Sequence, residues 1–241
     1  MKLLKKIPLF LSFFLLFSCD EFPITEADNA AGLKSALEFG SKYALNSLGS
    51  KDGFYLDMAV KIGLPQDAAD LVKAGKGIPF LGDAIDKIEK ELILALNRAA
   101  EASIEGVIPI VVNSIKEMTI QDATSILFSS NQTAATNYLH GKTYEPLTGV
   151  CYSVIDETLS RNIVGSSAQD LWKRLTGYYN DVAFLVPTLK PIETDLALYT
   201  TQKALDGVFL KISDEEVKIR TDVSARVTDL LRKVFGQLDK P

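Results

Sequence analysis

The stretch LALYTTQKALDGVFLKISDEEVKIR, residues 196–220, decides the fold class. Its apolar residues recur at three- and four-residue steps, the spacing that places side chains on one face of an α-helix. They are Leu196, Tyr199, Leu205, Phe209, Ile212 and Ile219. We therefore expect a long helix over residues 193–220, with this face in a hydrophobic core.

The same spacing recurs on both sides of this stretch. It predicts further helices over residues 29–49, 64–74, 82–118, 119–128, 134–143, 145–162, 168–182 and 224–235. Gly49 is expected to end the first helix, and Thr119 and Asp122 have the spacing of a capping box. We expect Pro109 to kink its helix or begin a new one, and Pro146 to lie in a first turn. Residues 108–112 are the single strand-like patch, so the prediction is an all-α, single compact multi-helix bundle over residues 29–237.

The N-terminus, MKLLKKIPLFLSFFLLFSC, has the pattern of an export signal. Three lysines precede an apolar run over residues 7–17, which is too short to span a bilayer. Leu16 and Ser18 before Cys19 resemble the bacterial lipobox, in which the cysteine is lipidated and becomes the first mature residue. We expect a lipoprotein signal peptide over residues 1–18 and a lipidated tether over 19–28. The alternative is an ordinary signal peptide cut near Ser18.

The charge balance limits the classes of partner. The chain has 26 basic and 31 acidic residues, a net charge of −5. Loss of residues 1–18 removes three lysines and no acid, which leaves −8. An acidic surface does not favour nucleic acid or anionic lipid headgroups, so the lipid itself would hold the chain on the membrane.

The sequence lacks the residues that most catalytic and metal sites require. His140 is the single histidine, which excludes multi-histidine metal sites, and no Gly-x-Ser-x-Gly motif or P-loop occurs. We expect no cofactor and no metal site. Cys151 lies among apolar residues and is expected to be buried. Asp206 and Glu216 could serve as paired carboxylates, but a solvated helix face is favoured, with Glu216–Arg220 as a surface pair.

Two groups of residues are candidates for contacts with a ligand or partner. Arg98, Lys203 and Asp206 lie within otherwise apolar helical blocks. Such groups either form caps and salt bridges between helices or line an apolar cavity, where Arg98 or Lys203 would hold an acidic headgroup. Phe54 and Tyr55 lie in the loop 50–57. They would either form an exposed aromatic contact or pack at the edge of the core.

Several blocks resemble, in the same order, the bacterial family called domain of unknown function 4197. They are GLKSALEFGSKYALNSLGSKDGFY (32–55), LNRAAEAS (96–103), IKEMTIQDATSIL (115–127), AATNYL (134–139), YTTQKALDGVFLKISDEEVKIR (199–220) and ARVTDLLRKVFG (225–236). The resemblance implies a mostly helical, secreted or lipid-anchored protein, often of Gram-negative bacteria. It implies no reaction and carries over no catalytic residue.

These observations favour a non-catalytic envelope lipoprotein that binds a partner or supports the envelope. Its expected location is the outer membrane or the periplasmic membrane face. One alternative is a carrier or sensor of an apolar or acidic small ligand held in a pocket between helices. A hydrolase that uses Asp206 and Glu216 is a third and weaker hypothesis. The sequence names neither the ligand nor the partner.

Overall fold

The computed structural model describes residues 23–77, 79–161, 166–185 and 190–239, and every regular element within them is a helix. The helices are α1 (Glu26–Gly49), α2 (Gln66–Lys76), α3 (Gly82–Glu117), α4 (Ile120–Leu127), α5 (Ala134–Ser160), α6 (Ala168–Leu185), α7 (Leu196–Thr221) and α8 (Asp229–Phe235), with short 3₁₀ turns η1 (Val223–Ala225) and η2 (Gly236–Leu238). The all-α prediction is confirmed for the described part of the chain.

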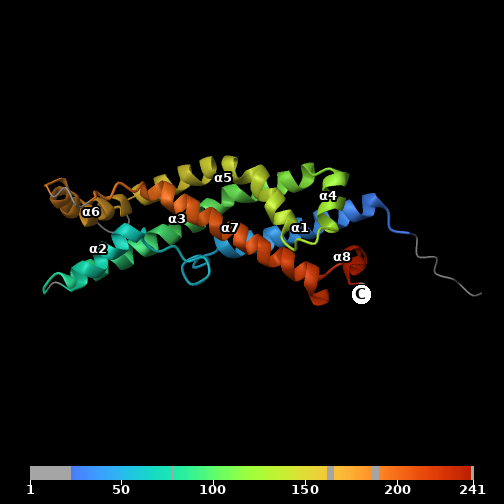
Figure 1. The fold of residues 1–241 in the computed structure, drawn as a ribbon, viewed down its shortest axis with the longest axis horizontal. Coiled ribbons are helices and arrows are strands. Elements are labelled where there is room, and N and C mark those ends of the chain that lie inside the picture. Colours follow the sequence, from blue (N-terminus) through green and yellow to red (C-terminus); the bar gives the residue numbers. More distant parts are fainter. Residues whose placement is uncertain (1–22, 78, 162–165, 186–189, 240–241) are drawn as a thin grey trace, which may run out of the picture.

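Four long helices form the body of an elongated bundle (Figure 1). Helix α3 packs against α1 and α5, and α7 packs against the same two helices from the other side. Their apolar faces meet in one core that includes Leu45, Leu96, Leu147 and Leu205, all fully buried. Each such leucine stabilises the fold by about 1.5–3 kcal/mol. The helical periodicity of the sequence therefore corresponds to the buried face of each long helix.

The two ends of the bundle carry different short helices. Helix α2 packs on the first turns of α3 and α6 packs on α3 and α5 at one end, whereas α4 and α8 pack on α1 at the other. The described chain begins at this second end, beside α8 (Figure 1). The first and last described residues, Pro23 and Asp239, consequently lie at the same end of the molecule.

Local capping signals place several helix ends where the sequence predicted them. Thr119 and Asp122 form a reciprocal capping box on α4, and Gly49 is the last residue of α1. Thr25 and Asp28 form a second capping box, so α1 begins at Glu26, earlier than the expected Asn29. Each box satisfies main-chain N–H groups that the first helical turn leaves without an intrahelical acceptor.

Three expectations from the sequence are wrong. Helix α5 runs unbroken through Pro146 where two helices were expected. The last helix is divided, because η1 is capped by Asp222 and α8 begins only after its own cap, Thr228. The Glu216–Arg220 pair is buried rather than on the surface.

The buried Glu216–Arg220 pair joins three helices. The Glu216 carboxylate accepts hydrogen bonds from the main-chain N–H groups of Ala135 and Thr136, at 3.0 and 2.8 Å, at the start of α5. Arg220 donates to Glu216 at 2.9 Å and to the carbonyl oxygens of Ile126 and Leu127 at the end of α4. An anion at a helix N-terminus and a cation at a helix C-terminus are each stabilised by the helix dipole. This pair thus fixes the α4–α5 corner to α7.

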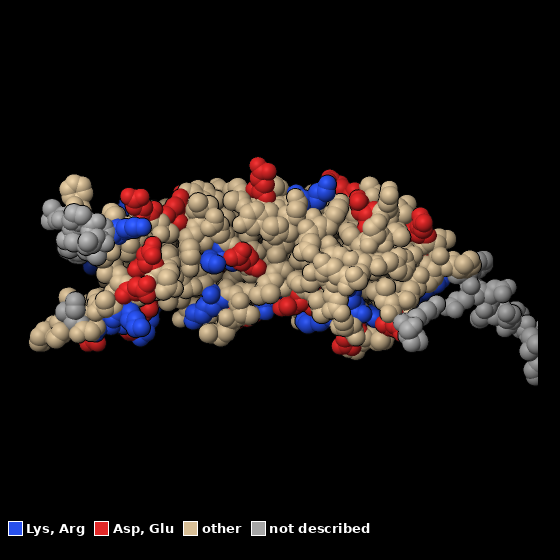
Figure 2. Space-filling model, in the orientation of Figure 1, with Lys and Arg blue, Asp and Glu red and all other residues tan. Residues whose placement is uncertain are grey.

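Charged side chains of both signs are interspersed on the face in Figure 2. That face carries no extended basic surface, consistent with the charge balance of the sequence.

Candidate functional site

Residues 50–65 join α1 to α2 without a helix, and we call them the clamped loop. Connections of this length without regular structure are usually functional or disordered. This one is neither disordered nor loosely packed, since Phe54, Val60 and Ile62 are buried in the main core. Side chains from α3 hold one side of the loop and side chains from α7 hold the other.

Asn97 of α3 holds the clamped loop at Ile62, near its end. Its Oδ1 accepts a hydrogen bond from the N–H of Ile62 at 2.9 Å, and its Nδ2 donates to the Ile62 carbonyl oxygen at 2.8 Å. The same Nδ2 also donates to the carbonyl of Ile93, and Asn97 is fully buried. The side chain replaces the two hydrogen bonds that a neighbouring strand would give Ile62. Asn97 therefore satisfies both main-chain polar groups of Ile62, which are buried away from water.

Glu101, one helical turn further on, holds the first part of the loop. Its Oε1 accepts from the N–H groups of Phe54 and Tyr55 at 3.2 and 3.3 Å, and its Oε2 accepts from Arg98 at 2.6 Å. Arg98 also donates to Asp52 at 2.6 Å. Glu101, followed by Asp52, raises the pKa of Arg98 above its usual value. These contacts make Arg98 the link between α3 and the loop.

The loop turns sharply at Asp52 and Gly53. Asp52 has φ 70°, in the left-handed region that few residues other than glycine adopt readily. A Cβ at Gly53 would lie 2.3 Å from the carbonyl oxygen of Ser47 and 2.5 Å from that of Leu48. Since both atoms belong to the backbone of α1, only glycine fits at this position.

Helix α7 holds the second part of the loop. Lys211 Nζ lies 2.5 Å from Asp57 Oδ2, and the Tyr199 hydroxyl donates to the Gly63 carbonyl at 3.1 Å. The lysine lowers the pKa of Asp57. Gly207 allows α7 to pack closely against Phe54 and Val60, because a Cβ there would lie 2.9 Å from the Phe54 ring. The clamped loop is thus held between two long helices.

The two aromatic candidates in this loop have different surroundings. Phe54 is fully buried, so it cannot provide the exposed contact considered from the sequence. Tyr55 is half-buried, with the Lys61 ammonium 4.2 Å from the centre of its ring and the Arg98 guanidinium 5.9 Å from it. The exposed large apolar side chains of the loop are instead Leu56 and Met58, which are 68% and 82% exposed. We call Leu56 and Met58 the loop tip.

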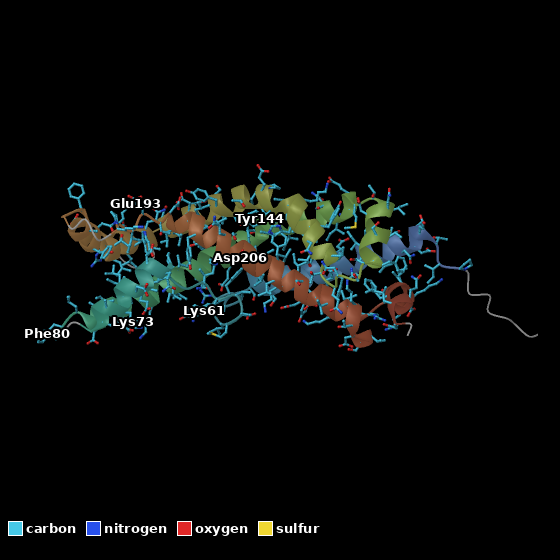
Figure 3. All side chains as sticks on the ribbon, in the orientation of Figure 1. Lys61, Lys73, Phe80, Tyr144, Glu193 and Asp206 are labelled. Atoms are coloured by element: carbon cyan, nitrogen blue, oxygen red, sulfur yellow. The ribbon has the colours of Figure 1, made fainter. Side chains whose placement is uncertain are left out.

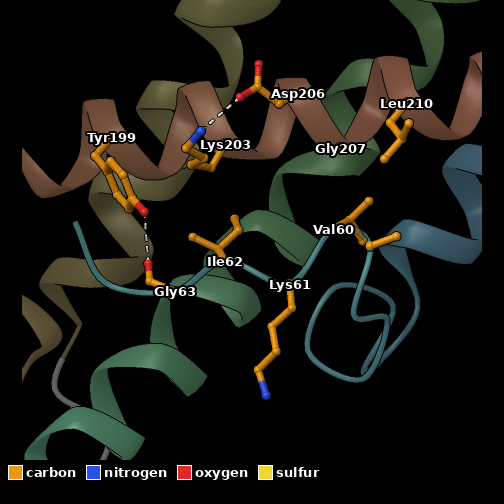
Figure 4. Close-up of a pocket in the computed structure, with 10 residues that line it drawn as sticks. Val60, Lys61, Ile62, Gly63, Tyr199, Lys203, Asp206, Gly207 and Leu210 are labelled. Atoms are coloured by element: carbon orange, nitrogen blue, oxygen red, sulfur yellow. Dashed lines mark hydrogen bonds and ion pairs between the residues drawn. The ribbon is translucent and has the colours of Figure 1, made fainter. Parts of the chain in front are cut away.

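An open hollow of about 330 Å³ lies between the clamped loop and α7 (Figure 4). Lys203, Asp206 and Leu210 line it from α7, together with residues 59–63 of the loop. Lys203 lies 3.2 Å from Asp206, so these two candidates neutralise each other at the hollow. The Lys61 side chain points away from Lys203 (Figure 4). Arg98 is not among the lining residues, so the structure does not bring Arg98 and Lys203 together.

Neither candidate carboxylate pair nor nucleophile is arranged for catalysis within the described residues. Asp206 is exposed, whereas the buried Glu216 uses both carboxylate oxygens to hold α5 and Arg220. Burial raises the pKa of the Cys151 thiol to about 11, which keeps it protonated at neutral pH. His140 is exposed and stacks on Tyr144 with ring centres 4.7 Å apart. No group of three or more His, Cys, Asp or Glu residues suited to a metal occurs in the part of the chain described here.

The comparison with protein families gives one match, over residues 23–236, to a family described as Protein of unknown function (DUF4197). The chain belongs to this family. The match spans α1 to α8 and includes the whole clamped loop with its partners on α3 and α7. No curated protein and no solved structure matches the chain.

The family assignment confirms the resemblance but assigns no activity to DUF4197. The signal peptide and Cys19 lie outside the described residues, so the lipid anchor stays a prediction. Within the described residues, no helix has the length and apolar character needed to cross a bilayer.

Proposed function

We propose that this chain is a non-catalytic interaction module of the bacterial cell envelope, attached to a membrane by lipid on Cys19. It binds a protein partner through the loop tip and the adjoining surface of α7. The observation that supports this proposal is the combination of a rigidly held loop with exposed apolar side chains at its tip. Leu56 and Met58 are exposed, whereas the backbone beside them is held by buried Asn97 and Glu101.

A fixed loop binds a partner with a smaller loss of conformational entropy than a flexible one. A flexible loop becomes ordered on binding and loses conformational entropy, whereas a loop that is already ordered avoids much of that loss. Apolar side chains in water contribute nothing to the fold, yet they contribute to affinity when a partner covers them. Methionine is also suited to contact surfaces because its unbranched, polarizable side chain adapts to a partner. Leu210, 42% exposed on α7, adds an apolar side chain to the lining of the hollow.

Carriage of a small ligand has less support. The hollow is open and lies near the lower end of the ~300–1,000 Å³ range of ligand pockets. Its one lysine from α7 is already paired with Asp206, and Arg98 is held elsewhere by two carboxylates. A hydrolytic role has less support still, because Glu216 has no free oxygen for acid–base work.

Site-specific photo-crosslinking in cells tests the proposal. A photoreactive amino acid replaces Met58 in the full chain, and a matched chain carries it at Ile120, which is 50% exposed on α4, at the end of the bundle that carries α8. We expect one discrete crosslinked product from position 58 and not from position 120. With that partner purified, Leu56→Asp should raise Kd at least tenfold without lowering the melting temperature. Identical products from both positions, or an unchanged Kd, would contradict the proposal.

The lipid anchor is tested separately by labelling cells with palmitate. We expect the label on the full chain and its absence from Cys19→Ser, which should also leave the membrane fraction. Persistence of the label in Cys19→Ser would show that another site is acylated.

A further inference from the structure

The anchor predicted at Cys19 restricts which end of the bundle can lie near the bilayer. Helix α1 begins at Glu26 behind its cap, Thr25. Six residues of chain from Cys19 to Thr25 reach about 20 Å at most, since an extended residue spans ~3.5 Å. The first turn of α1 must therefore stay within about 20 Å of the lipid. This step rests on the anchor in the proposed function.

The C-terminal segment lies at the same end of the bundle. Gln237 donates to the side chain of Asn29 at 2.7 Å, and Gly32 of α1 packs directly on Val234 of α8. Figure 1 shows α8 beside the first turns of α1. Whatever brings the start of α1 to a membrane therefore brings α8 with it.

This segment carries three apolar side chains that are partly exposed to solvent. Val223, Val227 and Leu230 are 58%, 50% and 36% exposed, and all three lie within eight residues of chain. We call them the C-terminal apolar segment. The intervening Arg226 is 1% exposed, so its guanidinium points inward where an arginine would ordinarily lie in water. The usual arrangement, with the charge outside and the valines inside, is reversed here.

Arg226 also fixes the backbone of the segment. It donates to the carbonyl oxygens of Ile219 and Arg220 at 3.0 and 2.9 Å, and it pairs with Asp239. The exposed valines therefore project from an ordered turn rather than from a fraying end. A short ordered segment with apolar side chains outward can insert shallowly into the headgroup–acyl boundary of a bilayer.

The charges around the segment favour a bilayer contact that does not rely on anionic lipid. Residues 221–235 contain three basic and two acidic side chains. Arg232 pairs with Asp229 at 2.7 Å, and the tether adds Asp20 and Glu21. With so small a net charge, apolar burial rather than electrostatic attraction would supply the contact.

We propose that the C-terminal apolar segment contacts the same bilayer that holds the lipid on Cys19. The bundle then stands on its α4–α8 end with α2 and α6 directed away from the membrane. Phe80 lies at the tip furthest from the tether (Figure 3). Because α3 has 36 residues and rises ~1.5 Å per residue, that tip would stand about 50 Å further from the membrane than the α4–α8 end does. The lipid alone would give a freely pivoting tether, whereas this second contact sets the orientation.

Quenching by brominated lipid tests the contact in the full, lipidated chain. Val227→Trp places an indole in the segment, and Met58→Trp places one at the loop tip as the matched control. The protein is reconstituted in phosphatidylethanolamine vesicles with phosphatidylglycerol as the minor lipid, with and without bromine on the acyl chains. The native Trp172 is buried on α6, and its constant emission is subtracted with the unsubstituted chain.

We expect brominated lipid to remove at least half of the new emission for Val227→Trp and almost none for Met58→Trp. Val223→Trp is a second variant in case the first unfolds. If the chain floats with the vesicles but the indole at 227 is unquenched, the bilayer contact is wrong and the anchor stands. If that indole is instead shielded from aqueous acrylamide, a second copy or another protein covers the segment, which also overturns the proposal. Loss of flotation together with loss of palmitate label would refute the anchor itself.

Discussion

Asn97→Ala is the sharpest test of the clamped loop, because a single side chain holds both polar groups of Ile62. The substitution leaves the N–H and the carbonyl oxygen of Ile62 without partners in a fully buried position. It removes no charge and changes no contact at the loop tip. Apart from the bond to the Ile93 carbonyl within α3, the hydrogen bonds that are lost are those that fix the loop.

The expected loss of stability is similar whether the loop stays closed or opens after the substitution. If the loop stays closed, two buried main-chain groups lose their hydrogen bonds at about 1–3 kcal/mol each. If the loop opens to hydrate them, buried Phe54 and Ile62 become exposed, at about 1.5–3 kcal/mol each. The first route costs about 2–6 kcal/mol and the second about 3–6 kcal/mol, so a loss of about 3 kcal/mol lies within both ranges. For a domain of this size, that lowers the melting temperature by roughly 6–12 °C.

Urea denaturation and amide exchange measure the two parts of this prediction. The free energy of unfolding should fall by about 3 kcal/mol. The Phe54 amide should exchange at least tenfold faster, whereas the exchange rates of the Leu45 and Leu205 amides should rise only as much as the loss of global stability requires. Asn113→Ala is the matched control, since Asn113 is exposed on the same helix. A loss below about 0.5 kcal/mol, with unchanged exchange at Phe54, would refute the assignment of Asn97 as the residue that holds the loop.

Three further substitutions test the turn, the buried ion pair and the loop–α7 contact. Gly53→Ala should destabilise the fold by about 1–3 kcal/mol, because its Cβ would overlap backbone oxygens. Gly141→Ala, with open space at its Cβ in α5, should instead stabilise it by about 0.5–1 kcal/mol in the same denaturation assay. Glu216→Gln should cost about 3–5 kcal/mol by leaving a buried arginine unpaired, whereas Glu215→Gln should change stability by less than about 1 kcal/mol; equal effects would contradict the burial of the pair. Asp57→Asn should lower stability by roughly 0.5–1 kcal/mol at pH 7. Because the pKa of Asp57 is lowered in the folded state, the stability that its charge contributes is present above about pH 4 and is lost as the pH falls through the folded pKa. The free energies of unfolding of the two proteins should therefore converge towards pH 2. A difference that persists at pH 2 would show that the charge of Asp57 is not its source.

Local signals in the sequence were sufficient to predict most of the helices. The capping box of Thr119 and Asp122 and the terminal Gly49 act within one helical turn, so their effect can be read without knowing the rest of the fold. The apolar spacing of α7 likewise reflects a single property, the face it buries. The structure confirms these predictions, each of which depends on neighbouring residues alone.

The prolines show where local reasoning fails. Pro109 and Pro146 lie inside long helices, although each removes one main-chain hydrogen bond. Both are exposed, so the carbonyl oxygen left without a partner can be hydrated. On the opposite face, Val107, Val111 and Leu147 are fully buried and keep the helices continuous across the break. The stability gained by burying the inner face exceeds the stability lost to proline on the outer face. This balance cannot be read from the sequence pattern of one helix alone.

The polar clusters could not be predicted from spacing, because their partners are distant in the sequence. Glu216 and Arg220 have the i,i+4 spacing of countless surface pairs, yet they bind α4 and α5 residues 80 or more positions away. Asn97 and Ile62 are 35 positions apart. The sequence showed only that polar residues interrupt apolar blocks. Which loop or helix end each one satisfies is decided by tertiary packing.

The location of these buried polar groups is itself an argument about function. A helical bundle gains no stability from buried ions that an apolar core would not supply equally well. Here Asn97 and Glu101 fix the clamped loop, and Arg226 fixes the C-terminal apolar segment. Both segments carry exposed apolar side chains. A backbone held in place beneath exposed apolar side chains is what the two proposed contact surfaces require.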